Sequence, residues 1–260
     1  MAQQWVAKGS IPLPAPAEGL VSLVASTWSE GFFLLDGLSL EVLSVDGQGD
    51  LRRRFGGWGD GPLSLDFPRD LAVAENSVFV LDQGRHQVLR LDARLNPVSR
   101  TPLPEDYFPA LFARDARQRF WVVFENRAGL HLFDDQGTLL DVVGDEASGS
   151  AAILHPTLIA ASPNEVAVWD AMDRSISILH LSGRQRRRLP LEWEGAVRAM
   201  VWSDEHLILA ADNALLQFDP ADGTVRPLAL SENAIDLAYR SSTLYGLVPS
   251  GAVHAFHSTP

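Results

Sequence analysis

The chain has 260 residues and a net charge of −12, from 33 acidic and 21 basic residues. An acidic chain lacks the basic footprint of proteins that bind nucleic-acid phosphates, so we expect no nucleic-acid partner. Cysteine is absent, which excludes disulfides, cysteine nucleophiles and thiolate metal sites. No apolar run approaches the roughly 18 residues of a membrane-spanning helix, so we expect a chain that does not span a membrane.

A pattern of short strands recurs about six times along the chain. The copies lie at residues 23–46, 71–92, 113–134, 159–181, 199–219 and 236–256. Acidic residues that close the second strand stand at positions 36, 82, 125, 170 and 212, which gives spacings of 46, 43, 45 and 42. A period of about 40–50 residues is typical of propeller blades or of helical solenoid repeats.

The residues inside each copy decide between these two architectures. The apolar runs, such as SVFVLD, RFWVVF and EVAVWD, are short, rich in β-branched or aromatic residues, and bounded by turn residues. We therefore predict an all-β fold, a six-bladed β-propeller of four-stranded antiparallel blades that forms one domain over residues 1–260. The predicted blades are approximately 20–56, 68–104, 109–144, 156–191, 197–229, and 234–260 together with 1–14.

The two ends of the chain are predicted to complete one blade. The last copy stops after its third strand, at HAFHSTP, whereas the first residues, QQWVAKGSIPLP, resemble the fourth strands of other copies. We expect the N-terminal strand to be the outer strand of the last blade, because this closure joins the first and last blades without a free edge.

The segment from Gly56 to Asp92 resembles an NHL repeat. It has a glycine-rich lead, a proline before the inner strand, an aspartate that ends the second strand and a basic residue that opens the third. In this chain these are Gly57, Gly59, Gly61, Pro62, Pro68, Asp82 and Arg85. Blades one, five and six depart from the pattern. The resemblance implies an NHL-like propeller but not an activity, because this fold hosts many functions.

Strand order predicts where a binding site would lie. The links between blades and the turns between second and third strands share one face, which we call the loop face. It is expected to carry six candidate ligand-binding residues: Trp58, Phe67, Tyr107, Phe108, His155 and Trp193. Aromatic anchors among acidic residues would suit a protein, peptide or small ligand. Alternatively, these aromatics pack over the blade junctions and seal the core.

Two sets of charged residues are interpreted as structural. The acidic residues at 36, 82, 125, 170 and 212 stand before turns, where a carboxylate can accept backbone N–H groups, and they lie too far apart to hold one metal ion. Arg85, Arg127 and Arg174 are expected to pair with neighbouring carboxylates. The runs 52–54 and 186–188 are expected on outer strands, where charge opposes aggregation or docks an acidic partner.

The mouth of the central channel is the alternative place for chemistry. The inner strands are predicted to present Ser22, Asp70, Leu111, Leu158, Arg198 and Asp236 there. Related propeller hydrolases hold calcium with converging oxygen ligands, but two leucines and an arginine interrupt such a set. We therefore expect no metal and no cofactor. If the protein is an enzyme, Asp70, His155, Arg198 and Asp236 are the candidate catalytic residues.

Two functions remain open from the sequence. The first is a non-enzymatic binding scaffold that recognises a protein, peptide or small ligand on the loop face around the channel. The second is a propeller lyase or hydrolase at the channel mouth, metal-dependent in one form. The start, MAQQW, lacks the basic and apolar regions of a signal peptide and fits a chain whose export signal has been removed. Together with the absence of cysteine, this favours a periplasmic or extracellular location over a cytoplasmic one.

Overall fold

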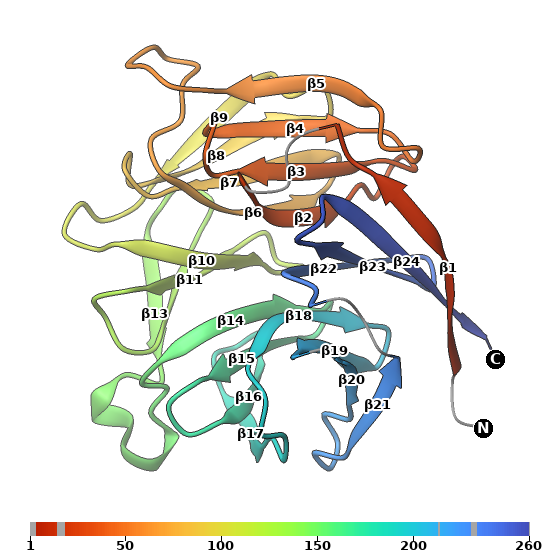
Figure 1. Ribbon diagram of the computed structural model, residues 1–260. Helices are drawn as coiled ribbons and strands as arrows, with labels where there is room; N and C mark the ends of the chain where they lie inside the picture. Colours follow the sequence, from red (N-terminus) through yellow and green to blue (C-terminus); the bar gives the residue numbers. More distant parts are fainter. Residues whose placement is uncertain (1–3, 15–18, 213, 230–232, 260) are drawn as a thin grey trace.

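The protein is a six-bladed β-propeller, as the sequence predicts (Figure 1). This computed structural model describes residues 4–14, 19–212, 214–229 and 233–259. The side chain of Arg186 and parts of the links before blades 1 and 6 lie outside the described residues. The six four-stranded sheets stand around a central axis, and each pairs its strands in an antiparallel meander.

The strands follow one another in chain order within the first five blades. Blade 1 consists of β2 (Leu20–Ala25), β3 (Phe32–Asp36), β4 (Glu41–Val45) and β5 (Leu51–Gly56). Blade 2 consists of β6 (Pro68–Ala74), β7 (Ser77–Asp82), β8 (Gln87–Asp92) and β9 (Pro97–Pro102). Blade 3 consists of β10 (Pro109–Arg114), β11 (Phe120–Phe124), β12 (Leu130–Phe133) and β13 (Leu139–Val143).

The 3₁₀ helix η2 (Glu146–Ala151) interrupts the link from blade 3 to blade 4. Blade 4 consists of β14 (Pro156–Ala161), β15 (Glu165–Asp170), β16 (Ser175–His180) and β17 (Gln185–Pro190). Blade 5 consists of β18 (Val197–Ser203), β19 (His206–Ala211), β20 (Ala214–Phe218) and β21 (Val225–Ala229).

The N-terminal strand closes blade 6, which confirms the predicted closure. This blade consists of β22 (Asp236–Arg240), β23 (Thr243–Val248), β24 (Ala252–Thr259) and, as its outer strand, β1 (Gln4–Pro12). Strand β1 pairs with β24 from Gln4 opposite Thr259 to Pro12 opposite Ala252. The indole of Trp5 is buried against blades 5 and 6.

The core lies between the blades. Among the described residues, buried apolar side chains form six clusters, and each cluster joins two neighbouring blades. Both faces of a blade therefore pack on a neighbour, so the second strands β3, β7 and β11 are buried along their whole length. Outer strands such as β9 are largely exposed. This gradient explains why the apolar runs of the sequence mark the second strands. No described helix is long and apolar enough to cross a membrane.

The inner strands of blades 1 to 5 begin with a β-bulge, which changes one prediction. In blade 2 the bulge lies between Pro68 and Asp70, and in blade 5 it lies between Val197 and Ala199. Ala199 is therefore the residue in register with Asp70, and Arg198 is the extra residue of the bulge. A shift of one residue turns the side chain to another direction. The prediction that the inner strand of blade 5 presents Arg198 at the mouth of the channel was therefore wrong.

Candidate functional site

All six candidate ligand-binding residues lie in links of the loop face. Trp58 and Phe67 come from the β5–β6 link, and Tyr107 and Phe108 from the β9–β10 link. His155 ends the β13–β14 link, and Trp193 lies in the β17–β18 link. The structure thus brings these residues to one side of the propeller, although they come from four separate segments of the chain.

Three of the aromatic residues are open to solvent. The exposed fractions of Trp58, Phe67 and Phe108 are 79%, 57% and 50%. The indole Nε1 of Trp58 donates a hydrogen bond to the carbonyl oxygen of Leu38 over 3.2 Å, which ties the β5–β6 link to the turn of blade 1. These rings are available for contact, as expected of a recognition surface.

Tyr107 and Trp193 instead pack against the core, as the alternative interpretation predicted. The ring of Tyr107 lies edge-on to Phe124 with 5.0 Å between centroids, and the Arg127 guanidinium covers it at 4.6 Å. Trp193 packs against the cluster between blades 4 and 5. Exposure therefore divides the aromatic set: Trp58, Phe67 and Phe108 are open to solvent, whereas Tyr107 and Trp193 pack against the core.

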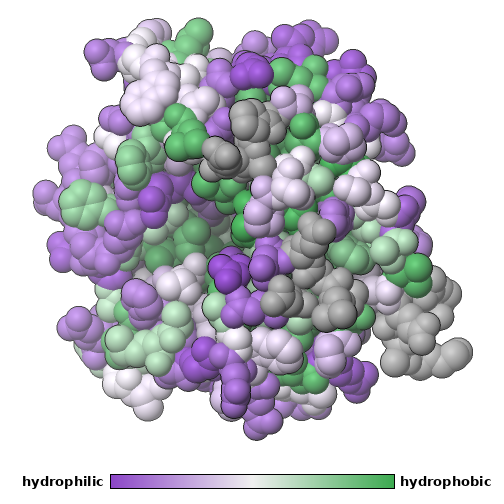
Figure 2. Space-filling model, in the orientation of Figure 1, coloured by the Kyte–Doolittle hydropathy of each residue, from purple (hydrophilic) through white to green (hydrophobic). Residues whose placement is uncertain are grey.

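The exposed apolar side chains are concentrated on the loop face. Eight of the twelve large apolar residues that are exposed in the described part of the chain stand there, over blades 1 to 4. We call these eight the apolar arc: Val21, Leu38, Trp58, Leu63, Phe67, Phe108, Leu154 and Met172. In Figure 2, apolar residues form the floor of a recess near the middle of the view, with hydrophilic residues around it. Large exposed apolar patches with a polar rim are typical of interaction sites.

The glycine-rich lead of blade 2 presents the most exposed of these residues. Gly56, Gly57 and Gly59, which flank Trp58, have φ angles of 102°, 101° and 135°. Only glycine adopts such angles without strain. The lead therefore forms a loop that projects its indole into solvent.

Basic residues of the same face brace the links. The Arg85 guanidinium donates to the carbonyl oxygen of Gly61 and to Ser64 Oγ. Arg174 donates to the carbonyl oxygens of Trp193 and Gly195. The expected pairing with carboxylates is limited, for Arg85, to a 3.9 Å contact with Asp82, because the loop carbonyls compete for the guanidinium.

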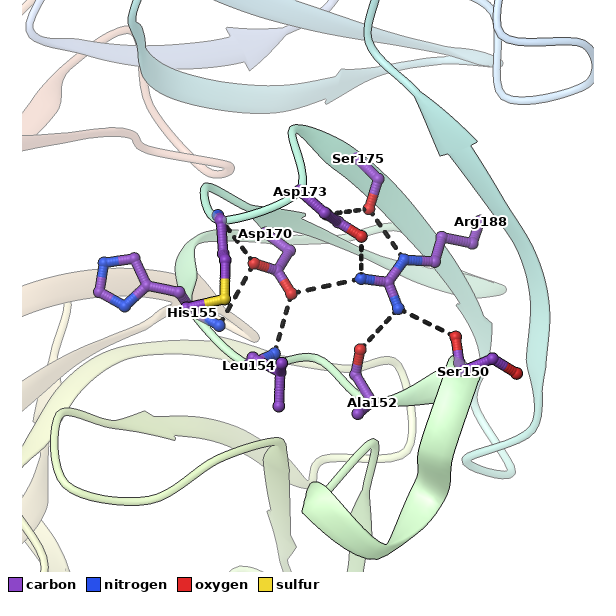
Figure 3. Close-up of polar contacts among 9 residues, drawn as sticks. Ser150, Ala152, Leu154, His155, Asp170, Asp173, Ser175 and Arg188 are labelled. Carbon is purple, nitrogen blue, oxygen red and sulfur yellow. Dashed lines mark hydrogen bonds and ion pairs between the residues drawn. The ribbon is translucent and has the colours of Figure 1, made fainter.

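Carboxylates of the repeat fix the links from below. Asp82 Oδ1 accepts the backbone N–H of Asp66 over 3.0 Å. Asp170, which is buried, accepts the N–H groups of Leu154, His155 and Met172 (Figure 3). These bonds agree with the structural role predicted for the acidic series. Glu125 and Asp212 were predicted to end their second strands, but each lies one residue after the end of its strand.

Arg188, in the arginine run 186–188, holds a neighbouring link in place in addition to carrying charge on an outer strand. Its guanidinium donates to the carbonyl oxygens of Ser150 and Ala152 and pairs with Asp173 and Asp170 (Figure 3). The outer strand β17 thereby holds the long β13–β14 link in place. Arg52 and Arg54 of the first run pair with acidic residues of their own blade.

The channel mouth brings together Asp70, Ser22 and Asp236 from blades 2, 1 and 6. Ser22 Oγ lies 3.4 Å from Asp70 Oδ1. Each carboxylate also reaches the next blade: Asp70 Oδ2 accepts the N–H of Phe112 over 3.1 Å, and Asp236 Oδ2 that of Leu23 over 2.6 Å. All three line a channel of about 330 Å³.

Burial shapes the protonation of this cluster. Desolvation raises the pKa of Asp70 to about 7, with a further contribution from the charge of Asp236. Desolvation also raises the pKa of Asp236 to about 6. One carboxyl of the pair can therefore keep its proton near neutral pH, as a general acid requires.

The other two candidate catalytic residues lie elsewhere. Arg198 is exposed and pairs with Asp212 over 2.6 Å. His155 is exposed above a hollow of about 600 Å³ between blades 3 and 4, which Arg69, Glu125 and Arg127 also line. In Figure 3 its imidazole points away from Asp170. The structure therefore does not assemble the predicted set of four. Within the described ranges, no three His, Asp or Glu side chains are placed to hold a metal ion.

The raised pKa values of the two channel carboxyls predict a pH dependence of stability. Both carboxyls have folded-state pKa values above the unfolded value of about 3.9, so the folded state holds their protons more tightly than the unfolded state does. Their contribution to stability is therefore complete below about pH 4 and is lost as pH rises through about 7. We expect the free energy of unfolding to fall less steeply between about pH 5 and pH 8 in an Asp70→Asn/Asp236→Asn variant than in the wild type. Urea unfolding at each pH measures this slope.

A variant with neutralised residues outside the channel is the control for that experiment. Asp50 and Glu205 lie in exposed turns on the opposite face, and an Asp50→Asn/Glu205→Gln variant should keep the wild-type slope. Equal slopes in the channel variant and the wild type would contradict the assignment of the two channel carboxyls.

Solved structures of other proteins share the fold of this chain, but at low sequence identity. No family model and no curated protein sequence matches the chain. A streptogramin B lyase structure matches with a TM-score of 0.67 and 12% identity over 98% of both chains. Virginiamycin B lyase from Staphylococcus aureus matches with a TM-score of 0.68 and 9% identity, over 98% of this chain and 99% of the lyase. A catalytically inactive variant of that lyase with quinupristin gives 0.68 and 10% over the same shares. At these identities the likeness shows a shared fold alone.

Proposed function

We propose that the protein is a non-enzymatic, NHL-like binding propeller whose loop face docks a partner protein or peptide. The observation that carries the proposal is the apolar arc, which places most of the exposed large apolar side chains on one face. Exposed aromatic anchors surrounded by polar residues are the usual energetic centre of an interface.

Contacts join residues of the apolar arc that lie over blades 1 and 2. Val21 lies at the start of β2 and packs beside Gly37, and Leu38 follows Gly37 in the same turn. The hydrogen bond from Trp58 to Leu38 joins the next blade to this group. The Arg69 guanidinium lies over the Phe67 ring, 5.9 Å from its centroid.

Photo-crosslinking in the native host tests the proposal. A benzophenone amino acid at Trp58 or Phe108 should give one discrete adduct with the same partner. The matched control positions are Val98 and Leu140, which are similarly exposed but lie on the outer strands β9 and β13. Adducts of equal yield from the control positions, or no adduct from either arc position, would contradict it.

Affinity for the captured partner gives the second measurement. We expect a Trp58→Ser/Phe67→Ser/Phe108→Ser variant to bind at least about 10-fold more weakly, a loss of about 1.4 kcal/mol or more. Its folding stability should stay close to wild type, because surface substitutions usually change it by about 0.5 kcal/mol or less. A Val98→Ser/Leu140→Ser variant should bind like the wild type.

The alternative function is a lyase or hydrolase at the channel mouth. It is favoured by the raised pKa of Asp70 and by the fold shared with streptogramin lyases. Against it stand the separation of His155 and Arg198 from the channel pair and the absence of histidine among the described channel-lining residues. The Asp70→Asn/Asp236→Asn variant discriminates between the two: a scaffold keeps its partner affinity, whereas a channel site loses its ligand.

A further inference from the structure

The links of the loop face carry charge of one sign. The four fully described links between blades are residues 57–67, 103–108, 144–155 and 191–196. Each contains two acidic residues, and none contains lysine or arginine, although the chain has 21 basic residues. The eight acidic residues are Asp60, Asp66, Glu105, Asp106, Asp145, Glu146, Glu192 and Glu194.

Most of these carboxylates have no counter-charge within the protein. In the described structure, seven of the eight side chains make no hydrogen bond or ion pair. Asp145 accepts from Ser148, and the carboxylate of Asp66 lies beside Gly84. The arginines beside these links do not pair with the eight carboxylates: Arg85 and Arg174 donate to link carbonyl oxygens, whereas Arg69 pairs with Glu125 and Arg198 with Asp212. The negative charge of the links is therefore available to a ligand.

One hollow combines this charge with an aromatic wall. Glu192, Trp193 and Glu194 line it together with Leu191, Gly195 and Arg174, and its volume is about 720 Å³. Two carboxylates and one guanidinium, that of Arg174, line the hollow, so its net charge is negative although Arg174 also donates to two loop carbonyls. An indole beside carboxylates suits a lysine or arginine side chain through ion pairing and cation–π contact. We call it the Trp193 hollow.

The apolar arc ends next to this hollow. Met172, 67% exposed, lies in the turn between β15 and β16, and Arg174 of the same turn lines the hollow. An extended or helical segment lying across the face would meet apolar residues over blades 1 to 4 and carboxylates between them and at the end. Charge complementarity of this kind selects partners and speeds their encounter.

We infer that the loop face binds a cationic amphipathic segment of a partner protein, which inserts a lysine or arginine side chain into the Trp193 hollow. This inference rests on the proposed function and adds the chemistry of the partner. The apolar arc supplies contact area, and the unpaired link carboxylates select basic over acidic or neutral segments.

Three synthetic amphipathic peptides test the inference by calorimetric titration of the full chain. They share length and apolar residues and carry lysine, serine or glutamate at every polar position. The lysine peptide should bind about 10-fold or more tightly than the serine peptide, and the glutamate peptide most weakly. Raising the salt from roughly 0.05 M to 0.5 M should weaken the lysine peptide several-fold and leave the serine peptide nearly unchanged.

Variants locate the selectivity. A Glu192→Gln/Glu194→Gln variant keeps side-chain size and should lower the affinity of the lysine peptide about 5-fold, without affecting the serine peptide. The matched control is Asp50→Asn/Glu205→Gln on the opposite face, which should leave all affinities as they are.

The outcomes separate the inference from the proposed function. Equal affinities of the lysine and serine peptides, both reduced by Trp58→Ser/Phe67→Ser/Phe108→Ser, would overturn the cationic preference and keep the binding face. Binding of the lysine peptide that neither variant set changes would overturn both. Failure of the lysine peptide to bind at all would overturn the inference, while the crosslinking experiment would still decide the proposed function.

Discussion

Deletion of residues 2–12 is expected to remove most of the protein's stability. The deletion takes away β1, the outer strand of blade 6, and exposes the edge of β24 along its whole paired length. It also removes Trp5, 8% exposed, from the cluster between blades 5 and 6. Loss of a buried tryptophan side chain alone costs about 3–5 kcal/mol. Added to the lost strand pairing, this approaches the roughly 5–15 kcal/mol that stabilises a typical domain.

Urea unfolding and size-exclusion chromatography measure this result. The truncated chain should unfold at much lower urea concentration and form aggregates, because the free edge of β24 can pair with another chain. Two variants serve as controls. Trp5→Ala keeps the strand and should lose only the packing part, and Val6→Ser, on an exposed position of the same strand, should change little. Unchanged stability of the truncated chain would show that the closure is dispensable.

Replacement of Asp170 by alanine should be the most damaging single change near the loop face. Its carboxylate is 1% exposed, accepts three backbone N–H groups and lies 3.5 Å from Arg188. Without it, the three donors lose their acceptor and the partly buried guanidinium of Arg188 loses one of its two carboxylate partners. Breaking a buried, hydrogen-bonded charge pair costs about 3–5 kcal/mol, so we expect a loss of this size in urea unfolding.

A local readout distinguishes this effect from general destabilisation. The lost bonds hold the β13–β14 link, so cleavage after Glu146 by a glutamate-specific protease should become faster under native conditions. The matched control is Asp173→Asn. Asp173 contacts the same arginine but is 43% exposed, and such pairs contribute at most about 1 kcal/mol. Equal losses in the two variants would contradict the role assigned to Asp170.

The repeat made most of the architecture predictable. The second strands are buried on both faces between neighbouring blades, so runs such as SVFVLD are apolar throughout and recur at each blade. Asp82 and Asp170 recur because a carboxylate at this point accepts N–H groups of the preceding link. Closure by β1 followed from a missing fourth strand at one end and an unpaired strand at the other.

The candidate site was predictable as a face but not residue by residue. Tyr107 and Phe108 are neighbours in one link, yet the first packs on Phe124 and the second is half exposed. Nothing in the local sequence distinguishes them, because the direction of each ring depends on the blade beneath. The acidic character of the face was visible in the sequence, because the four described links contain acidic residues and no lysine or arginine.

The sequence by itself determined the six blades, their closure and the face on which the links gather, because these depend on the order and burial of strands that repeat. Only the tertiary structure decided which side chains meet. The bulge that starts β18 puts Ala199 in register with Asp70, and Arg198 pairs with Asp212. Asp236 joins Ser22 and Asp70 only when the first and last blades close the ring. The direction of a side chain beside a bulge and the residues that meet across the closed ring depend on contacts between residues far apart in the chain, so the repeat alone does not reveal them.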